Sequence, residues 1–170
     1  PLYNRATQQT LAPGSTFKPI SAIAGLEEGV IDADTYITDY VEYTKVVPHA
    51  NCWNSAGHGT INVEQAIEYS CNYFFYEVGY RLGSKNNTTE LNDSTGLALL
   101  AKYAKMFGLD SVSGLELPET TPRISDESVV RSAIGQATHN YTAAELARYV
   151  TAIANSGNLY QLSILDKITD

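Results

Sequence analysis

The chain has 170 residues, 44% of them hydrophobic, which is enough for one domain with an apolar core and too few for two large ones. Its net charge of −8 argues against the broad basic surface by which proteins bind nucleic acid. No apolar run reaches the roughly 20 residues that a membrane helix needs. We therefore expect a single domain over residues 1–170 that has no nucleic-acid partner.

The N-terminal part of the chain predicts one helix, over about residues 15–28. Pro13-Gly14 makes a turn, apolar residues then recur at helical spacing, and Gly29 is typical of the position after a helix. Residues 30–61 contain only short β-prone pieces, "TYIT" and "YTKVV", between turn-forming residues. We expect a loop-rich stretch there.

A capping box predicts the next helical segment. Asn62 is followed three residues later by Gln65, and a helical pattern then continues to Gly83, with a possible break near Ser70. An aromatic stripe along this segment favours a buried contact between helices over a ligand surface. The stripe consists of Tyr69, Tyr73, Tyr76 and Tyr80.

Two more helices are expected towards the C-terminus. The pattern predicts a helix over about residues 95–107, and residues 108–130 are typical of an ordered surface loop. Thr142 and Glu145 form a second capping box, which opens a helix to about Asn155. The chain is therefore predicted to be mostly helical, with few short strands.

The stretch "APGSTFKPIS" places Ser15 and Lys18 three positions apart at a helix start. This spacing puts the hydroxyl and the amine on one helix face, with Cβ atoms roughly 5–6 Å apart. A serine needs a nearby base to become a nucleophile, and a lysine can serve if burial lowers its pKa. An ordinary capped helix with a surface lysine would give the same pattern.

The stretch "EYSCNYFF" places Ser70 and Asn72 on either side of Cys71. If the chain leaves helical geometry there, a hydroxyl and an amide can face one cleft as a proton relay and a hydrogen-bonding pair. Helix capping explains the same residues without any chemistry, since serine and asparagine both favour the N-cap.

Together, the two motifs and their context resemble the transpeptidase domain of class B, high-molecular-weight penicillin-binding proteins of the elongation type. S-x-x-K, Ser-x-Asn and K-T-G form the signature set of penicillin-binding proteins and serine β-lactamases. The likeness extends over essentially the whole chain. It is carried by "NRATQQTLAPGSTFKPISAIAGLEEGVI", "CWNSAGHGTINVEQAIEYSCNYFFYEVGYRLG", "FGLDSVSGLELPE" and "IGQATHNYTAAELARYVTAIANSGN".

The resemblance implies roles for five residues. Ser15 would be the acylated nucleophile and Lys18 the base that takes its proton. Ser70 and Asn72 would be the relay and the contact with the substrate amide, and Trp53 would bind substrate near the cleft entrance. Ser15 would attack the penultimate D-alanine carbonyl of a D-Ala-D-Ala stem peptide, and the amine of a second stem would resolve the acyl-enzyme. β-Lactams would acylate the same serine.

The sequence departs from the family pattern in two places. It contains no K-T-G, whose strand supplies part of the oxyanion hole in the family and would lie beyond residue 170. Since losing one oxyanion donor costs on the order of a hundredfold in rate, we expect the chain to be inactive alone. Ala137 and Ala143 replace a glycine and a proline that the family commonly has.

No cofactor and no metal are predicted. His49, Cys52, His58 and Cys71 are zinc-ligand types, but their spacing lacks the paired short units of structural zinc sites. The family works outside the cytoplasmic membrane, where a bridge between the two cysteines would persist. A disulfide and two buried thiols fit the sequence equally well.

The resemblance also implies a fold, a location and partners. The parent fold is an α/β transpeptidase fold, and this chain would form its mostly α part, with Ser70–Asn72 facing the start of a central helix. The family is anchored at the outer face of the bacterial cytoplasmic membrane, by a segment that is not in this chain. Its partners are stem peptides, β-lactams and cell-wall synthesis proteins. The alternatives are a β-lactam sensor, a serine β-lactamase and an inactive structural module.

Overall fold

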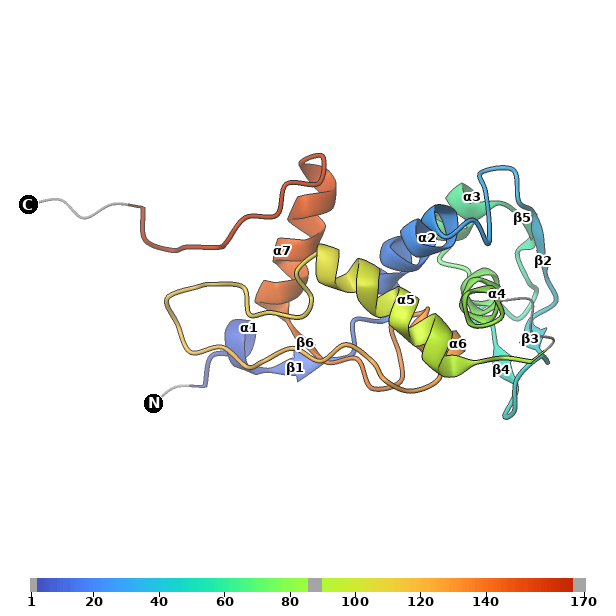
Figure 1. The fold of residues 1–170 in the computed structure, drawn as a ribbon, viewed down its shortest axis with the longest axis horizontal. Helices are drawn as coiled ribbons and strands as arrows, with labels where there is room; N and C mark the ends of the chain where they lie inside the picture. Colours follow the sequence, from blue (N-terminus) through green and yellow to red (C-terminus); the bar gives the residue numbers. More distant parts are fainter. Residues whose placement is uncertain (1–2, 86–89, 167–170) are drawn as a thin grey trace, which may run out of the picture.

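The computed structural model describes residues 3–85 and 90–166 (Figure 1). The helical elements are α1 (Arg5–Gln8), the 3₁₀ helix η1 (Gly14–Phe17), α2 (Lys18–Glu27), α3 (Val63–Glu68), α4 (Asn72–Gly83), α5 (Asp93–Met106), α6 (Val129–Ser132) and α7 (Ala143–Ala154). The strands are β1 (Thr10–Leu11), β2 (Ile37–Asp39), β3 (Glu42–Tyr43), β4 (Ala50–Asn51), β5 (Gly59–Ile61) and β6 (Tyr141–Thr142). The mostly helical composition with few short strands confirms the prediction.

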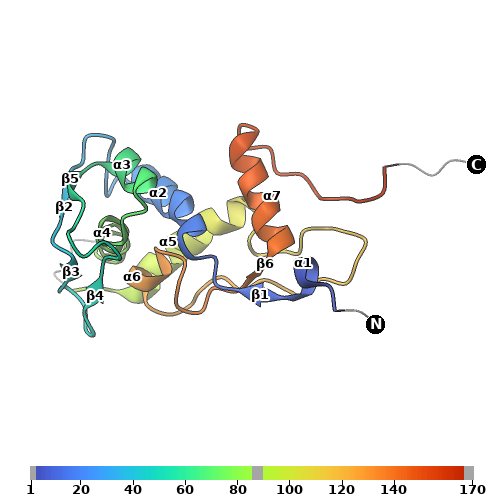
Figure 2. The same cartoon turned by 180° about the vertical axis from the view of Figure 1, so that it is seen from behind.

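The strands form three separate antiparallel pairs in the described part of the chain. β1 pairs with β6, β2 with β5, and β3 with β4. The pair β1–β6 joins residues 10–11 to residues 141–142, and α7 follows β6 directly and packs beside α1 (Figure 2). The chain just before η1 is thereby tied to the C-terminal helix.

Helix α4 lies at the centre of the larger part of the molecule. Figure 1 shows it end-on, between α2, α5 and α6 on one side and the short strands β2 to β5 on the other. Its residues Phe74, Phe75, Val78 and Leu82 are buried, because helical spacing turns them towards these neighbours. The apolar core therefore forms around α4 and supports both ends of this helix.

The predicted break near Ser70 is confirmed. Helix α3 ends at Glu68, Ser70 has a left-handed backbone with φ of 53°, and Cys71 caps α4 by accepting a hydrogen bond from the Phe74 N–H. A left-handed residue cannot continue a helix, so α4 starts in a new direction. The break sets Ser70 and Asn72 on a corner.

The prediction for the tyrosine stripe is wrong in its partner. Tyr73, Tyr76 and Tyr80 of α4 pack around the buried Tyr43 of β3, with ring centroids 5.2 to 6.4 Å apart. Tyr69 lies before the break and is partly exposed. The tyrosines of α4 therefore pack against a strand and not against another helix. Tyr69 does not share this contact, because the break before α4 separates it from the other three.

Both capping boxes form as predicted, at Asn62 before α3 and at Thr142 before α7. The loop predicted over residues 108–130 is irregular until α6 begins at Val129. Four short elements, α1, β1, α6 and β6, were not predicted, since pieces of two to four residues carry no periodicity. Across residues 3–85 and 90–166, no helix is both long and apolar enough to cross a membrane.

Candidate active site

Ser15 lies in η1, one turn before the regular helix α2, and its side chain is exposed. The 3₁₀ turn is closed locally by the Thr16 hydroxyl, which donates to the Pro13 carbonyl at 2.8 Å. The free N–H groups at such a helix start carry a partial positive charge, which favours an alkoxide at this position. The predicted nucleophile therefore faces solvent at the positive end of a helix.

The turn that carries Ser15 is held by the C-terminal half of the chain. The Gly14 N–H donates to the Gly135 carbonyl at 2.9 Å, and the Tyr149 hydroxyl donates to the Thr16 carbonyl at 3.0 Å. A Cβ on Gly135 would lie 2.1 Å from the Gly14 oxygen. Only glycine allows this close approach, so residue 135 fixes the position of the turn.

A buried histidine completes this support. The His139 ring packs on the Phe17 ring with centroids 4.2 Å apart. Its Nδ1 accepts from the Ser125 N–H at 3.1 Å, and its Nε2 donates to the Ser132 carbonyl at 3.2 Å. Burial lowers the pKa of His139 to about 4, so the ring is neutral near pH 7. Sequence reasoning missed this residue because its partners come from distant segments.

Lys18 is buried, with only 2% of its surface exposed, and its amine meets the corner between α3 and α4. The Nζ donates to the Ser70 carbonyl at 2.6 Å, the Ser70 Oγ at 2.9 Å and the Asn72 Oδ1 at 2.7 Å. The structure thus brings together three of the predicted site residues. In the described part of the chain, none of these bonds joins Lys18 to the Ser15 hydroxyl.

The surroundings of Lys18 lower its pKa. Its three hydrogen-bond partners are uncharged, and burial disfavours the ammonium form, which brings the pKa down from 10.5 to about 8. Electrostatic interaction with the nearby Cys71 and Cys52 side chains opposes this shift. A lysine with a pKa of about 8 has a fraction of free amine near neutral pH, which a general base requires.

Trp53 also lies at this corner. Its indole Nε1 donates to the Ser70 carbonyl at 3.0 Å, while 64% of the residue surface stays exposed. The Ser70 carbonyl therefore accepts from both Trp53 and Lys18. The exposed indole ring therefore lies beside the carbonyl that also binds the buried lysine, and its place near a cleft entrance stays a prediction.

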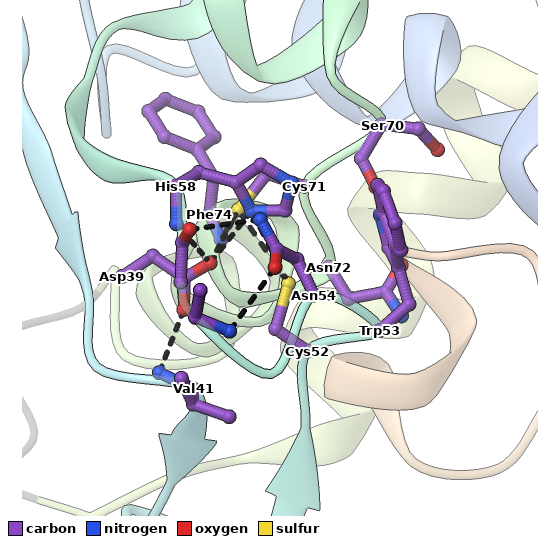
Figure 3. Close-up of polar contacts among 12 residues, drawn as sticks. Asp39, Val41, Cys52, Trp53, Asn54, His58, Ser70, Cys71, Asn72 and Phe74 are labelled. Atoms are coloured by element: carbon purple, nitrogen blue, oxygen red, sulfur yellow. Dashed lines mark hydrogen bonds and ion pairs between the residues drawn. The ribbon is translucent and has the colours of Figure 1, made fainter.

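Four potential metal ligands lie close together next to the corner between α3 and α4 (Figure 3). The ligand atoms of Asp39, Cys52, His58 and Cys71 all lie within 4.8 Å of one another. The Asp39 Oδ2 is 2.7 Å from the His58 Nδ1 and 3.4 Å from the Cys71 Sγ. The four residues come from the end of β2, the segment after β4, the segment before β5 and the cap of α4.

This donor set fits zinc. Two thiolates that each lie about 2.3 Å from a tetrahedral zinc ion are roughly 3.8 Å apart. The Sγ atoms of Cys52 and Cys71 are 3.9 Å apart, and the Cys52 Sγ is 3.5 Å from the His58 Nδ1. Although burial opposes ionisation, hydrogen bonds from His58 and Val41 keep the pKa of Asp39 below its usual value. A bound zinc would tie four segments together and leave no open position for chemistry.

The spacing argument against a metal site missed this cluster, because Asp39 and His58 reach it through folding rather than through short sequence intervals. His49, which the sequence grouped with the other ligands, is exposed and pairs with Glu42 at 3.0 Å instead. Of the two alternatives for the cysteines, the structure has two buried free thiols.

Comparisons with known proteins identify the family of this chain. The chain matches the family described as penicillin binding protein transpeptidase domain over residues 1–170. The peptidoglycan D,D-transpeptidase MrdA of Acinetobacter baumannii is 27% identical over 175 residues, which cover 93% of this chain and 24% of that protein. The chain spans about a quarter of the length of the curated relatives that it matches first.

Solved structures have the same fold. Penicillin-binding protein A from M. tuberculosis, solved as an imipenem acyl-enzyme complex, is 27% identical with a TM-score of 0.75, and the match covers 92% of this chain and 35% of that one. PBP2 from Helicobacter pylori, solved in complex with MreC, has a TM-score of 0.82 at 24% identity, over 99% of this chain and 32% of that one. The chain therefore belongs to the penicillin-binding protein transpeptidase family, as the resemblance of its sequence predicted.

Proposed function

We propose that this chain carries the nucleophile of a peptidoglycan D,D-transpeptidase of the elongation type, and that Ser15 is the residue acylated. The observation that supports this most directly is the buried Lys18, held by Ser70 and Asn72 one helical turn after an exposed serine. A buried lysine without a carboxylate partner is costly, and such lysines are typical of functional sites. Residues 1–170 form a single, partial transpeptidase domain in this proposal.

The reaction begins with proton transfer from Ser15. Deprotonated Lys18 accepts the proton of the Ser15 hydroxyl, and Oγ attacks the penultimate D-alanine carbonyl. The partial positive charge at the start of η1 and α2 stabilises the developing negative charge on Oγ. Cleavage of the peptide bond releases the terminal D-alanine, and its nitrogen takes up a proton from the site.

Ser70 and Asn72 have separate roles in this proposal. The Ser70 Oγ lies 2.9 Å from the Lys18 Nζ and can pass a proton between the lysine and the leaving amine. The Asn72 Oδ1 holds the lysine at 2.7 Å, which leaves the amide nitrogen as a donor for a substrate carbonyl. Trp53 covers one side of the corner and contacts the substrate.

The substrate and the partners follow from the family. The acyl donor is a stem peptide ending in D-Ala-D-Ala, and the acceptor is the amine of a second stem peptide. A β-lactam reacts with Ser15 in place of the donor. The sequence contains no K-T-G, so we propose that a strand outside these 170 residues completes the oxyanion hole. The complete enzyme works at the outer face of the cytoplasmic membrane with other cell-wall synthesis proteins.

Labelling with fluorescent penicillin tests the nucleophile. In the complete enzyme, Ser15→Ala removes the attacking oxygen and is expected to abolish covalent labelling. Ser94→Ala is the matched control, because it removes an exposed serine hydroxyl on α5, outside the turn that carries Ser15, and it should label like the parent enzyme. Equal labelling of Ser15→Ala and the parent enzyme would disprove the assignment.

The pKa of Lys18 predicts how acylation depends on pH. The base is active as the free amine, and with a pKa of about 8 this form increases as the pH rises through that value. Between pH 7 and pH 9 the acylation rate constant should therefore rise about tenfold and then level off. Stopped-flow measurement with a chromogenic cephalosporin provides the profile. A rate constant that stays flat or falls over this range would contradict the role of Lys18.

A further inference from the structure

We propose that Cys52 and Cys71 make the buried ligand cluster a redox-sensitive site with two exclusive states. In the reduced state, the two thiolates hold a zinc ion together with Asp39 and His58. In the oxidised state, the same sulfur atoms form a disulfide and the metal leaves. The influence of these states on acylation rests on the function proposed above, whereas the two states themselves do not.

The geometry suits both states. The sulfur atoms are 3.9 Å apart, close to the separation that a shared zinc ion requires. A disulfide needs an S–S distance of about 2.05 Å, so the sulfurs must approach by roughly 2 Å. Zinc would then lose two of its four ligands, and Asp39 and His58 would be left bonded to each other at 2.7 Å. One pair of sulfurs cannot serve both states at once.

The oxidation is an exchange with another disulfide, which is the oxidant. The Cys52 thiolate attacks one sulfur of the oxidant and forms a mixed disulfide with it. The other sulfur of the oxidant leaves as a thiolate. The Cys71 thiolate then attacks the Cys52 sulfur, and the second oxidant thiolate leaves. Two cysteine thiolates are oxidised to one disulfide, one external disulfide is reduced to two thiolates that take up protons from water, and the zinc ion is released.

The cluster is connected to the proposed catalytic corner through both cysteines. Cys71 lies between Ser70 and Asn72, which hold the Lys18 amine. Trp53 follows Cys52 directly and donates to the Ser70 carbonyl at 3.0 Å. An approach of the two sulfurs by roughly 2 Å therefore moves both supports of the lysine. We expect the oxidised state to acylate more slowly than the reduced one.

Metal and thiol analysis of the complete enzyme tests the proposal. After loading with zinc and dialysis, the reduced enzyme should hold one zinc ion per chain at this site. Treatment with oxidised glutathione should lower that content at least tenfold, and peptide mapping should recover a Cys52–Cys71 cross-link. Reduction should restore zinc binding. A reduced enzyme without zinc, or an oxidised enzyme that keeps its zinc, would overturn the proposal, as would oxidation without this cross-link.

A pair of variants separates the disulfide from the metal. Cys52→Asp keeps a fourth ligand but removes one thiol, so its zinc content should not change with oxidised glutathione. Cys52→Ala keeps three ligands and should bind zinc at least tenfold more weakly. Zinc loss from Cys52→Asp on oxidation would overturn the proposal. These readouts need no penicillin, so they stay informative even if Ser15 proves not to be the nucleophile.

Acylation measured in the two states tests the connection to the corner. Penicillin labelling of the oxidised parent enzyme should be at least tenfold slower than that of the reduced enzyme, and reduction should restore it. Cys52→Asp should show no such difference. Equal labelling rates in the two states of the parent enzyme would overturn the connection between the cluster and Lys18.

Discussion

Replacing Lys18 by methionine is expected to lower the acylation rate constant of the complete enzyme by about 10²- to 10⁴-fold, because the change removes the general base. Methionine has nearly the length of lysine and suits a buried position, so the protein should still fold. The acceptors on Ser70 and Asn72 lose their shared donor, but the cost of burying an ammonium group disappears at the same time. The expected effect is therefore mainly on chemistry.

Lys102→Met is the matched control for this experiment. Lys102 is largely exposed and binds Glu28 at 2.8 Å on the surface of the molecule. Glu28 keeps Lys85 and the Tyr103 hydroxyl as partners, so the variant should acylate at the rate of the parent enzyme. Stopped-flow kinetics with a β-lactam, together with thermal melting curves, measure both variants. If Lys18→Met stayed within tenfold of the parent enzyme, Lys18 would not be the base.

Replacing Gly135 by alanine is expected to destabilise the protein by more than about 4 kcal/mol. The new Cβ would lie 2.1 Å from the Gly14 carbonyl oxygen, and the backbone at residue 135 has a φ of 71°. A left-handed backbone alone costs an alanine about 1–2 kcal/mol, and the overlap with the oxygen adds to this. Relief of the overlap would move the turn that carries Ser15, so any folded fraction should acylate slowly.

Gly29→Ala separates the two contributions. Gly29 has nearly the same backbone, with φ of 69°, but a Cβ there would meet no atom within 4 Å. This variant should therefore lose only the free energy that a left-handed alanine backbone costs, about 1–2 kcal/mol. It should acylate normally. Denaturation curves of the two variants measure the difference. Equal loss of stability would show that the contact between residue 135 and the Ser15 turn is not a tight one.

The proposed catalytic residues were accessible from the sequence because their motifs are local. Ser15 and Lys18 are three residues apart on one helix start, and helix propensity alone predicts that start. Ser70 and Asn72 favour helix caps, which indicated the break between α3 and α4. What spacing could not predict is that folding brings the second motif onto the Lys18 amine.

The cluster of four potential metal ligands and the supports of the Ser15 turn could not be predicted in the same way. Asp39 and Cys52 come from separate segments of the loop-rich stretch, and no short interval marks them as ligands. Gly135 and His139 act on the turn across more than 100 residues of chain. Such contacts depend on tertiary packing, so they cannot be predicted from the pattern of residues that are neighbours in the sequence.

The position of the acyl group tests the central claim most directly. After reaction of the complete enzyme with a β-lactam, peptide mapping by mass spectrometry locates the residue that carries the covalent adduct. We predict that the adduct is on Ser15 and that Ser15→Ala carries none. An adduct on any other residue of the parent enzyme would contradict the proposed function.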